Sequence, residues 1–116
     1  MTADFTPFGD VERTLEQSGP IATTFSVETL NVDTSKVATL DYLVTPAGTC
    51  VYQWDVNGTV IHGPVTLNTN NPRTMSENLD GGLLVDGVNQ LTVTLVGVGN
   101  DDMGISDGKL SFKTLI

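Results

Sequence analysis

The chain has 116 residues, of which 39% are hydrophobic, and this length fits a single domain with its own core. Fourteen acidic residues against five basic ones give a formal net charge of −9. This charge argues against a nucleic-acid partner, whose phosphates require clustered Lys and Arg, and against an anionic membrane surface. The single cysteine, Cys50, excludes an intrachain disulfide, and the first residues lack the basic and apolar regions of a secretory signal.

Residues 1–20 are predicted to form an N-terminal arm followed by a short helix. Phe5 and Phe8 give the arm two large apolar side chains, while Pro7 and Gly9 interrupt it. Two placements are open for these rings: the domain's own surface, or a neighbouring subunit on which the arm docks.

The short helix is predicted over residues 10–17. Asp10 is a suitable N-cap, Val11 and Leu15 lie four residues apart on one face, and Ser18-Gly19-Pro20 would end the helix. A helix of this length requires packing against the rest of the protein to persist.

Residues 21–116 are predicted to fold as a β-sandwich. Apolar and polar residues alternate with a period of two, which is typical of half-buried strands, and turn residues separate the alternating segments. The clearest of these segments are 37–45, 50–56, 73–79, 90–96 and 109–116. About eight short strands at near-regular spacing indicate an all-β, antiparallel jelly-roll sandwich.

The hairpin of residues 50–63 organises this pattern. Trp54, the only tryptophan, falls on the apolar side of its first strand, so we expect it between the two sheets. Asn57 and Gly58 follow directly, and this pair readily takes the positive φ angles of a two-residue type I′ turn.

Several short motifs occur in a familiar order. Leu40 and Tyr42 precede a strand that ends in V-N-G (56–58), then come D-G-x-N (86–89) and G-I-x-D (104–107). This order resembles the galactose-binding-like jelly roll of sugar-binding domains in family-two glycoside hydrolases, over roughly residues 22–116. The resemblance implies that fold and, in members that bind sugar, contacts from aromatic, Arg or Asn side chains of loops at one end. Here such loops supply Asn70, Asn71 and Arg73.

The sequence contains no motif for a catalytic nucleophile, a phosphate loop or a metalloenzyme. One histidine, His62, and one cysteine cannot supply a zinc site, so we expect no enzyme and no cofactor. Asp101, Asp102 and Asp107 lie in a glycine-rich stretch expected to be a long loop, 97–108. Such oxygen ligands suit Ca²⁺, but the spacing is not that of an EF-hand, and solvated turns explain the acids equally.

Two function classes fit these observations. The favoured one is a structural assembly protein, such as a decoration or cement protein of a tailed-phage capsid, because small jelly-roll proteins of that class resemble this chain in size and acidity. The Phe5 and Phe8 arm and the strand face of Thr92, Thr94 and Val96 would then contact a protein partner or form a homo-oligomer such as a dimer. We expect such a protein on the virion surface, or otherwise made in the cytoplasm. The alternative is a carbohydrate-binding module with its sugar loops at 68–73 and 99–107.

Overall fold

The computed structural model describes residues 2–61 and 63–115 as an antiparallel β-sandwich, which confirms the predicted fold class. None of the described residues belongs to a helix long and apolar enough to cross a membrane. The described chain contains one 3-10 turn, η1 (Gly81–Leu83), and the strands β1 (Ala3–Phe8), β2 (Arg13–Leu15), β3 (Ala22–Thr29), β4 (Val37–Pro46), β5 (Gly48–Val56), β6 (Thr59–Val60), β7 (Val65–Thr69), β8 (Arg73–Asp80), β9 (Gly87–Leu95) and β10 (Met103–Lys113).

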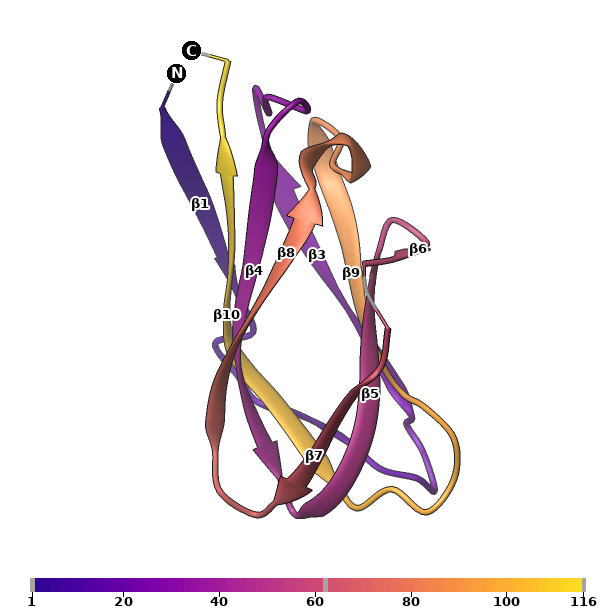
Figure 1. The fold of residues 1–116 in the computed structure, drawn as a ribbon. Helices are drawn as coiled ribbons and strands as arrows, with labels where there is room; N and C mark the ends of the chain where they lie inside the picture. The colour runs from indigo at the N-terminus through magenta and orange to yellow at the C-terminus, as the bar shows by residue number, and fades with distance from the viewer. Residues whose placement is uncertain (1, 62, 116) are drawn as a thin grey trace.

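The strands form two sheets that face each other (Figure 1). The first sheet has the order β1-β10-β4-β8, and β2 also pairs with β10 beyond the end of β1. The second sheet has the order β3-β9-β5-β6, and β7 also pairs with β5. The first and last strands are therefore neighbours, and the Thr2 and Thr114 hydroxyl oxygens lie 2.6 Å apart.

The first twenty residues differ from the prediction. The predicted helix is wrong: Leu15 is fully buried but Val11 is 73% exposed, and Arg13–Leu15 instead extend along β10. The predicted arm is strand β1, which pairs with β10 over its whole length. A short isolated helix is marginal, whereas the free side of β10 offers backbone partners to both segments, so the sheet captures them.

The core lies between the sheets and is centred on aromatic rings. Trp54 is 2% exposed, and its ring centroid lies 5.1 Å from Tyr42, 6.1 Å from Phe25 and 6.2 Å from Phe8. Asn57 and the following glycine have φ angles of 50° and 88°, so a two-residue turn joins β5 to β6. This turn sets the strand register that directs Trp54 inward.

A buried polar cluster lies beside this aromatic core. The Tyr42 hydroxyl donates a hydrogen bond of 2.8 Å to the Glu77 carboxylate, and the Tyr42 and Tyr52 hydroxyl oxygens lie 2.7 Å apart. Glu77 is 7% exposed. Burial raises the pKa of both phenols, that of Tyr52 to about 12. The cluster thus joins β4 and β8 of the first sheet to β5 of the second through hydrogen bonds in which both phenols keep their protons.

We predict that Trp54→Ala lowers the free energy of unfolding by about 3–5 kcal/mol, because it removes a large core side chain and leaves a cavity. Val88→Ala is the control: Val88 is 54% exposed, so its change should stay within about 0.5 kcal/mol. Denaturant titration measures both values. A loss of under about 1 kcal/mol for Trp54→Ala would contradict its place in the core.

We predict that the protein loses stability as the pH rises from about 10 toward 12. The unfolded chain releases its phenolic protons near pH 10, below the pKa of Tyr52 in the folded protein, so the stabilising contribution is complete below pH 10 and lost above it. Tyr52→Phe should flatten this decline in denaturant titrations at increasing pH. An unchanged slope in that variant would show that Tyr52 ionises alike in both states.

Candidate functional site

The loop residues that the sequence suggested for sugar binding lie at the connection from β7 to β8. Asn70 and Asn71 are exposed in the β7–β8 loop, where the Asn71 backbone N–H donates to the Thr69 hydroxyl at 3.1 Å. Arg73 begins β8 and pairs with Val44. None of the three lines any of the hollows described below.

The three aspartates considered for Ca²⁺ lie in two different places. Asp101 and Asp102 lie in the loop before β10. The Asp101 carboxylate accepts a hydrogen bond of 2.8 Å from the Thr49 backbone N–H, and the Asp102 backbone carbonyl accepts one of 2.8 Å from the Ala47 backbone N–H. The predicted loop is too long: β10 begins at Met103 and carries Asp107 away along the sheet. Within residues 2–61 and 63–115, no three acidic, histidine or cysteine side chains are placed to hold a metal ion, and His62 lies outside these residues.

Phe5 and Phe8 point to opposite sides of β1. Side chains three residues apart in a strand face opposite ways, and Phe5 is 59% exposed on the outer face of the first sheet. Phe8 is half-buried, and its ring centroid lies 5.0 Å from that of Phe25. The two rings therefore do not form one docking surface, because Phe8 packs into the core of its own chain.

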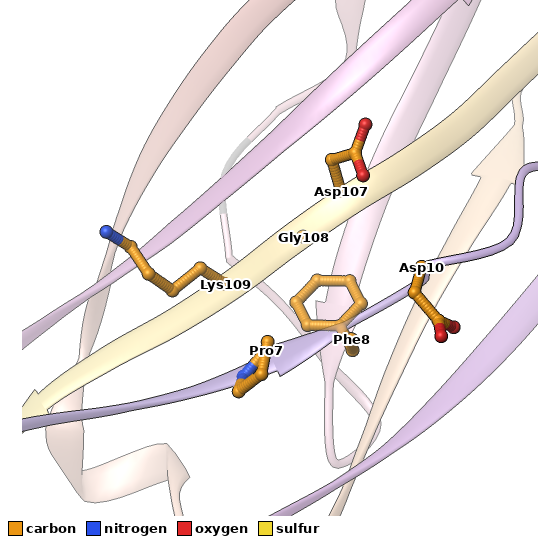
Figure 2. A pocket seen from close by; sticks show the side chains of 6 residues that line it. All are labelled: Pro7, Phe8, Asp10, Asp107, Gly108 and Lys109. Atoms are coloured by element: carbon orange, nitrogen blue, oxygen red, sulfur yellow. The ribbon is translucent and has the colours of Figure 1, made fainter.

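A hollow of about 540 Å³ opens where β1 ends against β10 (Figure 2). We call it the Phe8 hollow. Its lining combines an aromatic ring, two carboxylates and an amine, supplied by Pro7, Phe8, Asp10, Asp107, Gly108 and Lys109. In Figure 2 the Lys109 side chain extends away from the two carboxylates, so acceptors and donor lie in different parts of the hollow.

A bulge in β10 creates this hollow. The register of β10 against β4 shifts between Ser106 and Lys109, and Asp107 takes a φ angle of 51°. The Asp107 backbone N–H donates to the Gly9 carbonyl at 2.8 Å, which ties the bulge to the end of β1. Gly108 then lies under Phe8, and a Cβ atom at that position would overlap the ring.

The Lys109 ammonium connects the hollow to Phe5. Its nitrogen lies 5.6 Å from the Phe5 ring centroid, within range of a cation–π contact. Pro7, two residues from Phe5, lines the hollow on the same face of β1. An exposed aromatic ring, an amine and a hollow with two carboxylates in its lining thus adjoin along β1 and β10. This combination can bind a ligand that has both apolar faces and hydroxyl groups.

Sequence reasoning missed most of this site. The sequence pattern indicates a helix cap at Asp10 and a break in the arm at Pro7. It indicates no binding role for Gly108 or Lys109. The Asp107-Gly108 pair inside an alternating strand is the signal that predicts a bulge there. Nothing in the sequence pattern, however, shows that β1 is the strand facing it.

We predict that Gly108→Ala destabilises the fold by about 1–3 kcal/mol, because the added methyl group displaces the Phe8 ring from its site. Gly63→Ala is the matched control, since a Cβ atom there meets nothing within 4 Å. In denaturant titrations, Phe8→Ala should cost less in the Gly108→Ala background than alone. Strictly additive losses would contradict the contact between the two residues.

Comparisons with known proteins support the fold. No protein-family model and no curated protein matches the chain. Among solved structures, a CBM36 domain of a multidomain xylanase from the hindgut metagenome of Trinervitermes trinervoides matches with a TM-score of 0.62 and 7% identity, over 99% of this chain and 100% of that one. A CBM36 module in complex with calcium and xylotriose matches with a TM-score of 0.57 and 12% identity, over 94% and 98%.

A third similar structure is the C-terminal CBM6 of LamC, a marine laminarinase from Zobellia galactanivorans. It matches with a TM-score of 0.51 and 14% identity, over 89% of this chain and 100% of that one. At these identities the likeness concerns the fold, and the chain has the galactose-binding-like jelly-roll fold of carbohydrate-binding modules.

Proposed function

We propose that this chain is a non-catalytic carbohydrate-binding module whose glycan lies on the outer face of the first sheet, over Phe5 and beside the Phe8 hollow. The observation that carries the proposal is the exposure of Phe5. It is 59% exposed, whereas the other six aromatic side chains are buried or half-buried. An exposed aromatic ring next to a hollow with carboxylates and an amine in its lining provides what sugar recognition requires.

The chemistry of the surface suits a sugar ring. The apolar C–H face of a pyranose packs against the face of an aromatic ring, while its hydroxyl groups need hydrogen-bond partners at the rim. Asp10 and Asp107 can each accept hydrogen bonds from hydroxyl groups. The Lys109 ammonium, near the Phe5 ring, can donate to them.

The comparisons favour this function over capsid decoration, since the similar structures reported above are carbohydrate-binding modules. One fold hosts many functions, so the surface has to support the proposal as well. The assembly hypothesis needed both rings of the arm to reach a neighbour, and Phe8 contacts Phe25 and Trp54 of its own chain instead. A protein partner and a homo-oligomer stay predictions.

We predict that Phe5→Ala weakens glycan binding about tenfold or more. Covering an aromatic side chain stabilises a complex by about 1.5–3 kcal/mol, and about 1.4 kcal/mol is tenfold in affinity. Affinity gel electrophoresis against a panel of soluble neutral and acidic polysaccharides finds the ligand, and calorimetry with its oligosaccharide measures the affinity. Val88→Ala, an exposed apolar residue in β9 of the second sheet, should bind like the wild type.

If none of the polysaccharides slows the migration of the wild-type protein, the proposed function is wrong. Equal affinity of the wild type and Phe5→Ala for a glycan would move the site elsewhere on the molecule. Unfolding curves of both variants show whether each is folded, so a loss of binding can be separated from a loss of structure.

A further inference from the structure

We propose that the glycan is a linear acidic polysaccharide, which lies along the outer face of the first sheet as far as its β8 edge and meets the amines of Lys109, Lys113 and Lys36. This inference rests on the proposed function and specifies its ligand class. The observation behind it is a row of hollows, each lined by one lysine.

Two hollows follow one another along this face, and a third lies beyond them at the β8 edge of the sheet, where Ile61 approaches from the side of the second sheet. The Phe8 hollow is the first, and the second, of about 110 Å³, is lined by Ala3, Val37, Thr39, Ser111, Phe112 and Lys113. Phe5 separates the two: it lies between Ala3 and Pro7 on β1 and pairs with Ser111 on β10. The third hollow, of about 330 Å³, shares Val37 with the second and is lined by Ser35, Lys36, Val37, Ile61, Asn78, Leu79 and Asp80. We call this row of three hollows the lysine track.

The track contains every lysine of the chain, although the formal net charge is −9. Lys36, Lys109 and Lys113 are exposed, and none forms an ion pair within 4.0 Å with a carboxylate of the described residues. Asp41 is the cross-strand neighbour of Lys109 but lies outside that range. The three amines are therefore available to an anionic ligand.

The two arginines are placed differently. Arg13 donates to the Thr24 carbonyl at 2.7 Å and lies 4.2 Å from the Phe25 ring centroid, so it serves the structure. Arg73 pairs with Val44 near the far end of β4, away from the Lys36 end of that strand. The positively charged side chains that remain available to a ligand on this side of the molecule are therefore the three lysines of the track.

Carboxylates near the track indicate where an anionic group fits best. Asp10 and Asp107 line the first hollow, and Asp80 lines the third, where it accepts the Gly82 backbone N–H at 2.8 Å. The middle hollow has no carboxylate in its lining. The anionic group of the ligand is therefore placed at Lys113, with the Ser111 hydroxyl in the same hollow.

The spacing of the lysines requires a chain of sugars. Lys109 and Lys113 lie four residues apart on the same face of β10, which corresponds to about 13 Å along a strand. A single sugar cannot contact both amines and also the third hollow. A polymer with repeated anionic groups can, and the linked contacts reinforce one another.

The test uses three probes of equal length. They are a galacturonate tetrasaccharide, the same tetrasaccharide with its carboxyl groups reduced to neutral hydroxymethyl groups, and a sulfated galactan tetrasaccharide. We expect at least one anionic probe to bind about tenfold more tightly than the neutral one, an advantage that falls in about 0.5 M salt because exposed charges are screened. Whichever anionic probe binds identifies the group as carboxylate or sulfate.

Variants then locate the contact. Lys113→Gln should weaken binding of the anionic probe about fivefold and leave binding of the neutral probe unchanged, because it removes one exposed charge pair. Arg73→Gln, which removes a positive charge away from the track, is the matched control and should bind like the wild type. This inference would be overturned if the neutral and anionic probes bind with equal affinity and Lys113→Gln binds like the wild type. The proposed function would still stand in that case. Binding of no glycan at all would overturn both.

Discussion

Pairing along β10 is the constraint on which the rest of the structure depends. This strand binds β1 and β2 on one side and β4 on the other, so it closes the first sheet. Its bulge at Asp107 changes which residues face inward: Met103 and Ile105 point to the core before it, and Leu110 and Phe112 after it. Without the extra residue the last part of the strand would turn its apolar side chains to solvent. The same bulge leaves the Phe8 hollow open. The packing of the core and the shape of the candidate site therefore both depend on this bulge.

The aromatic residues have two different locations, the core and the protein surface. Ring contacts run from Phe8 through Phe25 and Trp54 to Tyr42, and from there to Tyr52, across the interface of the two sheets. These rings supply much of the apolar contact that fixes one sheet on the other. These rings pack in or against the core, whereas the Phe5 side chain is exposed to solvent. The Phe5 ring lies near Lys109 of the lysine track. The stability of the fold and the proposed glycan binding thus use different members of one residue class.

The sequence predicts the sandwich well because its strongest signals are local. The alternation around Trp54 and the Asn57 turn need only neighbouring residues to be interpreted, and the structure has that hairpin. The prediction for the first twenty residues is wrong because their conformation depends on β10, which lies about 90 to 110 positions away in the sequence. The site was missed for the same reason: Pro7 and Lys109 become neighbours only through this pairing. Residue spacing can suggest loops as binding sites, but it cannot show which strand lies beside another.

The pairing of the first and last strands also has a mechanical consequence. Ala3 faces Lys113, and the pairs continue inward from there to Phe8 and Gly108. A pulling force between residues 2 and 114 would therefore load these bonds one after another, as in a zipper, rather than all together. Strands loaded in this way separate at lower force than strands sheared along their length. A polymer lying across β1 and β10 would connect the two strands at this seam, so an occupied protein would resist tension better than an empty one.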